Sequence, residues 1–247
     1  MSEIIKTEAV VLSKTNYGDS SIIASLFTEE LGKISVIVKG ARSEKSKYGK
    51  IIDPLTYVLV VVYKKESREL QLISSADLIE YYSLIKNDLT RLSFAYGILE
   101  LIKNLLAEHE INKKMFKALL RILEKLNEGS EQSEILFGRF LFFFLKEIGY
   151  EIQIDSCSIC DRKNLGENIY YHRDKGVICG NCNKSVVESF EISMELLNYL
   201  NCLKTGESVN NFSNLIMQKA IKFMEDHLKY HIPDFKGISS LKLFNLR

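Results

Sequence analysis

The spacing of hydrophobic residues divides the chain into a β-rich part followed by a helical part. Between Thr7 and Ala76, apolar and polar residues alternate in five short segments, which predicts strands because successive side chains of a strand face opposite sides. The predicted strands comprise residues 7–15, 21–29, 32–41, 55–64 and 69–76. Their longest connection, 42–52, falls between the third and fourth strands. This arrangement predicts a small OB-fold barrel, with an SH3-like barrel as the alternative.

After Asp77 the apolar residues recur every three or four positions, the period of an amphipathic helix. The predicted helical segments comprise residues 89–108, 112–129, 133–150, 191–204 and 213–230. The pattern predicts an α+β protein with an OB-fold domain at 1–78 and a helical domain at 79–247. A cysteine-rich segment at 152–187 interrupts the helical domain.

Four of the five cysteines lie in two Cys-x-x-Cys pairs within that segment. Cys157 and Cys160 form the first pair, and Cys179 and Cys182 form the second, eighteen residues later. The segments 169–172 and 176–179 predict a hairpin that brings the second pair beside the first. Two such pairs close a tetrahedron around one ion, so the spacing indicates a zinc ribbon.

Four cysteine ligands leave no coordination position for water, so we expect one structural zinc ion per chain rather than a catalytic one. Two disulfides, a thioredoxin-like redox pair and an iron–sulfur cluster are the alternatives. Residues 1–12 lack the basic and apolar regions of a signal peptide, and no apolar run is long enough for a membrane span. We therefore expect a cytoplasmic protein, in a compartment where structural disulfides do not persist.

Positive charge is concentrated in one segment of a chain whose net charge is only +1. Residues 33–50 contain six cations and one acid, Glu44, which leaves a local charge of +5 (6 − 1). The cations are Lys33, Lys39, Arg42, Lys45, Lys47 and Lys50. A cluster on the third strand and the following loop of an OB-fold is suited to phosphate binding, and Tyr17 and Tyr48 could stack on bases. The alternative is a solvated loop with tyrosines that close the barrel rim.

A second set of cations, Lys114, Lys117 and Arg121, recurs on one face of the predicted helix 112–129. Such a stripe is commonly the solvated side of an amphipathic helix. As a functional site it would extend a DNA surface or bind an acidic peptide. Phosphate-loop, dinucleotide-binding and nucleophile-elbow motifs are missing from the sequence, which argues against an enzyme.

The N-terminal sequence resembles the bacterial RecO family of DNA repair proteins. The resemblance is carried by YGDSS at 17–21, FT at 27–28, GKIS at 32–35 and KGAR at 39–42, together with the inserted four-cysteine ribbon. The four cysteines match the zinc-bearing branch of the family. The similarity covers essentially the whole chain and is weakest in the C-terminal region.

The resemblance implies a recombination mediator that performs no chemistry. Members bind single- and double-stranded DNA, anneal complementary strands, pair with RecR and help to load RecA onto DNA coated by single-strand-binding protein. It implies that the barrel cations form the DNA surface, that the acidic tail of single-strand-binding protein is a partner, and that the protein associates with the nucleoid. A zinc-stabilised interaction scaffold and a zinc-dependent hydrolase with a dispersed active site remain as alternatives.

Overall fold

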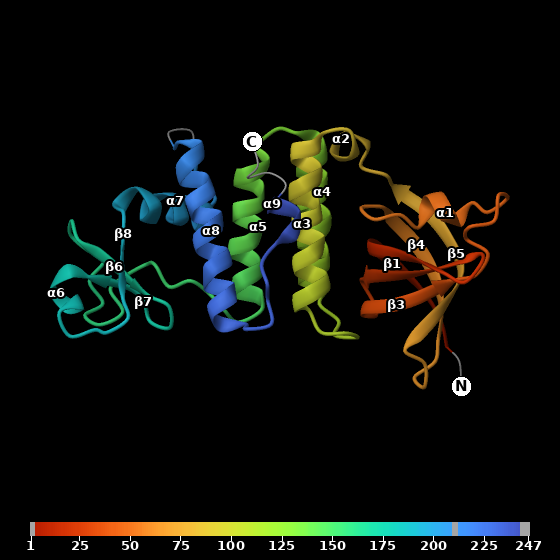
Figure 1. Ribbon diagram of the computed structural model, residues 1–247, viewed down its shortest axis with the longest axis horizontal. Coiled ribbons are helices and arrows are strands. Elements are labelled where there is room, and N and C mark those ends of the chain that lie inside the picture. The colour runs from red at the N-terminus through yellow and green to blue at the C-terminus, as the bar shows by residue number, and fades with distance from the viewer. Residues whose placement is uncertain (1–2, 209–211, 243–247) are drawn as a thin grey trace. The chain divides into compact units, whose positions relative to one another are not determined.

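The computed structural model describes residues 3–208 and 212–242 (Figure 1). The chain forms two compact units. The first is drawn from Met1–Ser130 and Ile238–Arg247, and the second from Glu131–Gly237. The chain thus leaves the first unit after Ser130 and returns to it at Ile238.

The first unit begins with a closed five-stranded barrel of strand order β1-β2-β3-β5-β4. Its strands are β1 (Glu3–Tyr17), β2 (Ser21–Thr28), β3 (Gly32–Val38), β4 (Tyr57–Lys64) and β5 (Leu70–Glu80). All neighbours are antiparallel except β3 and β5, which pair in parallel and close the barrel. A short helix, α1 (Tyr48–Ile51), lies in the long connection between β3 and β4. The predicted OB-type barrel is confirmed, as is the α+β fold class.

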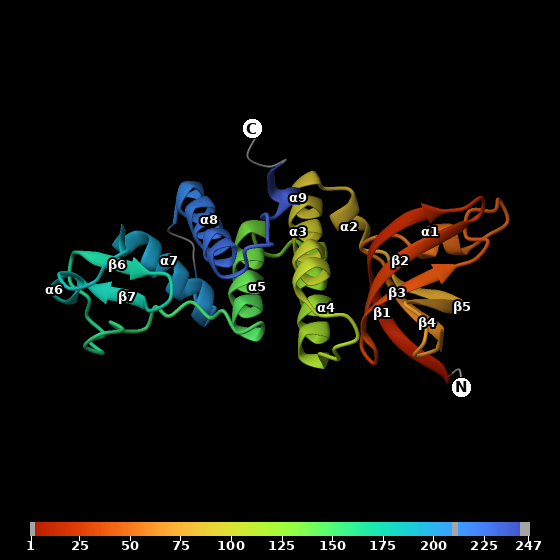
Figure 2. The same cartoon turned by 60° about the horizontal axis from the view of Figure 1, so that its bottom comes forward.

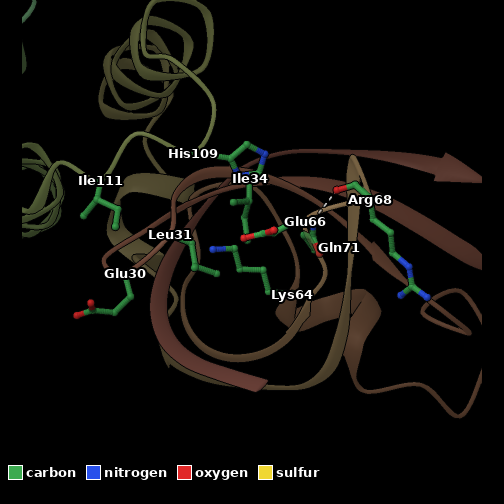
Figure 3. A pocket seen from close by; sticks show the side chains of 9 residues that line it. All are labelled: Glu30, Leu31, Ile34, Lys64, Glu66, Arg68, Gln71, His109 and Ile111. Atoms are coloured by element: carbon green, nitrogen blue, oxygen red, sulfur yellow. Dashed lines mark hydrogen bonds between the residues drawn. The ribbon is translucent and has the colours of Figure 1, made fainter. Parts of the chain in front are cut away.

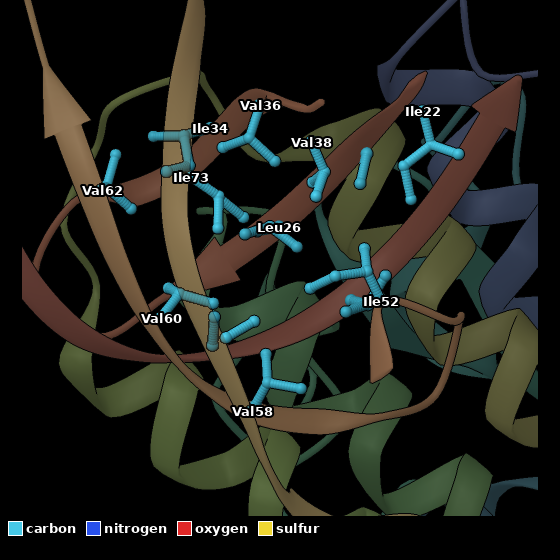
Figure 4. Close-up of a cluster of buried hydrophobic side chains, with 14 of the residues drawn as sticks. Ile22, Leu26, Ile34, Val36, Val38, Ile52, Val58, Val60, Val62 and Ile73 are labelled. Atoms are coloured by element: carbon cyan, nitrogen blue, oxygen red, sulfur yellow. The ribbon is translucent and has the colours of Figure 1, made fainter. Parts of the chain in front are cut away.

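The barrel interior is filled by branched aliphatic side chains from all five strands (Figure 4). Val58, Val60 and Val62 of β4 alternate inward and are fully buried, and Ile34 and Val36 of β3 face them from across the barrel. Alternation of this kind places every second residue in the core and turns the remaining residues outward. The barrel therefore needs no ligand to complete its interior.

Three helices of the first unit follow the barrel along the chain, and a fourth belongs to the C-terminal segment. They are α2 (Ser83–Lys86), α3 (Leu89–Leu105), α4 (Lys113–Glu128) and α9 (Ser239–Lys242). Asp88 and Asn112 accept N-terminal backbone N–H groups of α3 and α4, and Gly129 ends α4 in the left-handed conformation. Phe116 of α4 packs against Phe27 of the barrel, with ring centroids 5.8 Å apart.

Glu100 of α3 holds the returning segment in place. Its carboxylate accepts hydrogen bonds from the backbone N–H groups of Ser239 and Ser240, at 2.9 and 3.1 Å, and from the Ser240 hydroxyl at 2.9 Å. The buried side chains of Ile238 and Leu241 lie in the same segment. In Figures 1 and 2, α9 lies beside α3 in both views.

The second unit combines three long helices with a small three-stranded sheet of order β7-β6-β8. Its elements are α5 (Ser133–Glu147), β6 (Ile169–His172), β7 (Gly176–Cys179), α6 (Gly180–Asn183), β8 (Phe190–Ile192), α7 (Met194–Thr205) and α8 (Asn214–His231). The hairpin predicted between the cysteine pairs is present as β6 and β7. The helix predicted from residue 191 was wrong at its start, because residues 190–192 pair with β6 as a third strand.

No helix among the described residues has the length and apolar character needed to cross a membrane.

Candidate metal centre and nucleic-acid interface

The four paired cysteines converge at one end of the small sheet. Their sulfur atoms all lie within 4.8 Å of one another, and Sγ of Cys160 and Cys179 are 3.9 Å apart. A zinc ion with bonds of about 2.3 Å to four tetrahedral sulfurs would hold those sulfurs about 3.8 Å apart. All four cysteines are free thiols rather than disulfides. The donor set and its spacing therefore fit one tetrahedrally bound metal ion.

The backbone around the first pair is folded to point its sulfurs at that position. The Cys157 N–H donates to the Arg162 carbonyl oxygen at 2.9 Å, and the Asp161 N–H donates to the Cys157 carbonyl oxygen at 2.8 Å. The resulting turn has Asp161 in the left-handed region, with φ of 57°. The Cys179 N–H from the second pair donates to the Cys157 sulfur at 3.4 Å. The two turns thus support each other before any ion is considered.

The sulfurs influence one another's ionisation. Burial favours the neutral thiol of Cys157, but N–H groups of Cys179, Cys160 and Ile159 donate to its sulfur and hold its pKa at about 6. Hydrogen bonds with Cys160 and Cys179 raise the pKa of Cys182 to about 12. The thiolate of Cys157 is thus favoured, whereas ionisation of Cys182 is opposed by its hydrogen bonds with the neighbouring sulfurs. A divalent cation resolves this conflict because it stabilises all four thiolates together.

The barrel cations predicted to bind DNA are exposed, with one exception. Lys39, Arg42, Lys45 and Lys47 are all exposed on the connection between β3 and β4, and Lys50 is exposed on α1. Glu44 in the same loop and Asp77, which lies 3.4 Å from the Lys47 ammonium, reduce the local charge. A net positive, solvent-facing surface remains at this end of the barrel.

Arg42 links the two loops of this surface. Its guanidinium Nη1 donates to the Gly18 carbonyl oxygen at 2.9 Å, and its backbone N–H donates to the Ser20 carbonyl oxygen at 2.8 Å. Tyr17, at the end of β1, is 53% exposed. Tyr48 instead packs against the barrel core, and its hydroxyl lies 3.4 Å from the Ser74 carbonyl oxygen. Tyr48 is therefore half-buried, in contrast to Tyr17.

Lys33 does not share the exposed surface. It is only 7% exposed, and its ammonium donates to the Lys103 carbonyl oxygen at 2.6 Å and lies 3.5 Å from the Glu108 carboxylate. Its backbone carbonyl accepts the His109 N–H at 2.9 Å. Lys33 thus secures the end of α3 and the following loop to the barrel, and its ammonium is not part of the exposed cation cluster. Alternation along β3 places it on the face that α3 covers.

The same loop forms one wall of a pocket of about 270 Å³ at the N-terminal end of β3 (Figure 3). Leu31, Ile34 and Ile111 line its apolar side, while Lys64 comes from the end of β4 and Arg68 from the β4–β5 turn. Gly32 allows the loop to approach, because a Cβ there would lie 2.1 Å from the Glu110 carbonyl oxygen. No motif in the sequence indicated this pocket. The charged turn KKESRE was its only signal, and charged turns are common.

The second predicted cation set lies on the exposed face of α4. Lys114, Lys117 and Arg121 are exposed, whereas Met115, Phe116 and Leu119 between them are buried. The amphipathic arrangement predicted for this helix is therefore present. The geometry is compatible with both a solvated face and a binding surface.

Comparisons with known proteins match both units of the chain. The model described as "Recombination protein O N terminal" matches residues 1–82, and "Recombination protein O C terminal" matches residues 86–237. A DNA repair protein RecO from Chlorobium phaeobacteroides is 30% identical over 96% of this chain and 97% of its own length. The RecO proteins of Alkaliphilus metalliredigens and Caldanaerobacter subterraneus subsp. tengcongensis are 29% and 27% identical, over 97% and 94% of this chain and 98% and 95% of their own lengths. The chain therefore belongs to the RecO family and has a role in DNA repair.

Proposed function

We propose that this protein is a recombination mediator that binds single- and double-stranded DNA through the cations of the β3–β4 connection. It anneals complementary strands without nucleotide hydrolysis and, with RecR, helps to load RecA onto DNA coated by single-strand-binding protein. The observation that carries the proposal is the exposed cluster formed by Lys39, Arg42, Lys45, Lys47 and Lys50 in a RecO-family barrel.

The cluster suits phosphate binding for two reasons. Its lysines are exposed side chains on one connection, so several can reach neighbouring phosphates of the same strand. Arg42 holds this connection against the loop at Gly18, which limits the motion of the surface. Contacts to phosphates carry no base information, so binding is expected to be independent of sequence.

Annealing requires no catalytic group. Two strands repel each other through their phosphates, and a positive surface screens that repulsion while it raises their local concentration. Base pairing then supplies the free energy. The metal centre would act as a structural support, since four cysteine ligands leave no position for a reacting water.

The test measures duplex formation from labelled complementary oligonucleotides in the absence of ATP. The variant Lys39→Gln/Lys45→Gln removes two charges but leaves the Arg42 hydrogen bonds intact. Affinity for single strands is expected to fall, and the slope of log affinity against log salt to decrease by roughly 0.7 per lost contact. Annealing should slow in parallel.

The matched control is Lys219→Gln/Lys222→Gln, which removes two exposed charges from α8. It should retain the affinity, the salt slope and the annealing rate of the unaltered protein. If the barrel variant also retained all three while remaining folded, the proposed DNA surface would be wrong.

We propose the exposed α4 stripe as the binding site for the acidic tail of single-strand-binding protein. Lys114, Lys117 and Arg121 supply three exposed cations on one helix face. The variant in which all three are changed to Glu should lose binding of the tail peptide in a titration, while DNA affinity at the barrel persists. Unchanged peptide binding would place this site elsewhere.

Two other functions would give different results in the annealing assay. A zinc-stabilised scaffold would bind partners but would not accelerate duplex formation, and its barrel cations would be dispensable. A zinc-dependent hydrolase would need an open metal position, which four thiolates do not leave. A mediator of this kind acts on chromosomal DNA, so we place the protein in the cytoplasm with the nucleoid.

A further inference from the structure

The ribbon of the second unit contains a hollow that has no role in the function proposed above. Its volume is about 420 Å³, within the range of small-ligand sites. Its lining comes from the loop after the first cysteine pair, from β6 and from α6 with the residue that follows it. The lining side chains that matter here are Arg162, Glu167, Asn168, Tyr170, Asn181 and Lys184.

The polar groups in this hollow are available to a ligand. In the part of the chain that the structure describes, the side chains of Arg162, Asn168, Tyr170, Asn181 and Lys184 make no hydrogen bond or ion pair with other protein groups. Isolated surface groups of this kind are usually solvated, but here two amides, two cations and a phenol face one concave space. Their convergence distinguishes the hollow from ordinary surface.

The walls of the hollow are held by the fold of the ribbon. The Arg162 carbonyl accepts the Cys157 N–H, which attaches this loop to the first metal turn. Ile169, next to Asn168, is fully buried, and Leu165 is 7% exposed. On the other side, a Cβ at Gly180 would lie 3.2 Å from Asn168, so the start of α6 is in close contact with the residue before β6. The hollow is therefore formed before a ligand arrives.

The chemistry of the lining fits a single unpaired nucleotide. Each asparagine amide offers a donor and an acceptor, the pattern that pairs with a base edge. The half-buried ring of Tyr170 and the planar guanidinium of Arg162 are surfaces on which a base stacks. Arg162 and Lys184 can neutralise a phosphate. An apolar anchor of a protein partner would find only Leu165 and no apolar pocket.

We propose that this ribbon hollow binds an unpaired nucleotide of a single nucleic-acid strand. The site lies in Glu131–Gly237 and is distinct from the barrel surface, which lies in the other compact unit. It goes beyond the proposed function because it reads base edges rather than phosphates alone. A protein with both sites would distinguish single strands from duplex, in which base edges are already paired.

The decisive variant is Asn168→Ala/Asn181→Ala, tested in the full-length, metal-loaded protein. It removes the two amides and leaves the net charge unchanged. The probe is a fluorescent single-stranded oligonucleotide of mixed sequence, with the matching duplex as the second ligand. Affinity for the single strand should fall by about tenfold, while duplex affinity and the salt slope remain unchanged because no phosphate contact is lost.

A second variant, Arg162→Gln/Lys184→Gln, should weaken single-strand binding and reduce the salt slope by roughly 0.7 per cation. The control Asn104→Ala/Asn198→Ala removes two exposed helical amides and should change nothing. Metal content and thermal midpoint, measured for every variant, show whether the ribbon is intact.

Two results overturn this inference. One is unchanged single-strand affinity in the Asn168→Ala/Asn181→Ala variant with the metal retained, which would mean that the hollow holds another ligand or none. The other is an equal loss for single strand and duplex. The barrel variant Lys39→Gln/Lys45→Gln is measured in the same assay. If it loses affinity while the ribbon variant does not, the ribbon inference fails and the proposed barrel surface stands.

Discussion

Lys33 and Lys39 lie six residues apart on the same charged segment, yet the structure buries Lys33 and leaves Lys39 exposed. Replacing Lys33 by Met keeps most of its buried aliphatic stem and removes the ammonium. The Lys103 carbonyl, in the last turn of α3, then loses the hydrogen bond that it accepts at 2.6 Å. Because the final carbonyls of a helix have no partner within the helix, this group would be left without its present donor.

The expected cost follows from those contacts. A hydrogen bond from a charged donor contributes about 1.5–3 kcal/mol, and a cation at a helix C-terminus adds about 0.3–1 kcal/mol. The exposed Glu108 carboxylate at 3.5 Å adds little. Relief from burying the ammonium offsets part of the loss, so we expect a destabilisation of about 2 kcal/mol. For a chain of this length, that lowers the melting temperature by about 4–8 °C.

The assay pairs Lys33→Met with Lys39→Met. Thermal unfolding and hydrogen exchange in residues 106–111 report on the fold, and the salt dependence of single-strand binding reports on the DNA surface. Lys33→Met should destabilise the first unit, speed exchange in that loop and keep the salt slope. Lys39→Met should change stability by less than about 0.5 kcal/mol and reduce the slope by about 0.7.

The reverse pattern would refute this reasoning. If Lys33→Met reduced the salt slope as much as Lys39→Met did and left stability unchanged, Lys33 would contact DNA and its hydrogen bond to Lys103 would contribute nothing. If both variants lost stability and also reduced the salt slope, the two lysines would not have separate functions, and the total charge of the segment would determine both properties.

Three further predictions test other parts of the structure. One zinc ion per chain should co-purify. Cys160→Ser should lower the melting temperature of the second unit, because the free energy of metal binding contributes to folding. Stoichiometric iron, or a folded metal-free sample, would contradict this. Gly32→Ala should destabilise the protein by about 1–3 kcal/mol in chemical denaturation, because φ there is +66° and a Cβ would meet the Glu110 backbone. An unchanged denaturation midpoint would show that the loop containing Glu110 can move away. Burial lowers the pKa of His227 to about 4, so stability should fall as pH decreases from 6.5 to 4, where only the unfolded state gains the proton. In His227→Gln this part of the pH dependence should disappear, and an identical profile would exclude His227 as its origin.

The neutral form of His227 has a structural explanation. Its Nε2 lies 3.2 Å from the Tyr150 carbonyl oxygen, which can only accept, so Nε2 carries the proton. Its Nδ1 therefore accepts from the Tyr171 hydroxyl at 3.2 Å. His231 beside it further disfavours the protonated form. The sequence indicated none of this, since the partners are 56 and 77 residues away.

Much of the fold follows from local patterns. Alternation identified all five barrel strands, and helical periodicity identified α3, α4 and α5, because burial on one face imposes a period of two or about 3.6 residues. The strand β8 was missed because Phe190–Ile192 is short and pairs only with β6, a contact that no local pattern records. The short helix α1 was missed for a similar reason, being a single turn within a loop.

The metal centre was predictable from sequence because its chemistry depends on spacing. Two Cys-x-x-Cys turns can each direct two sulfurs to one point wherever the surrounding chain runs, and the sulfurs do lie within 4.8 Å of one another. The exposed cation cluster was predictable only in outline. Composition located the cations but could not distinguish exposed Lys39 from buried Lys33, since both belong to one charged segment.

The sequence alone thus determined the order of the barrel strands and long helices, the barrel core and the four-cysteine cluster, all of which depend on periodicity or short spacing. Only the tertiary structure decided which outward-facing residues of the barrel and its helices are covered by other elements. Helix α4 places Phe116 on Phe27, and the C-terminal segment returns to Glu100, so barrel, α2–α4 and α9 form one compact unit. Such contacts join residues far apart in the chain, and their free energy depends on burial and partner atoms that exist only once the chain has folded.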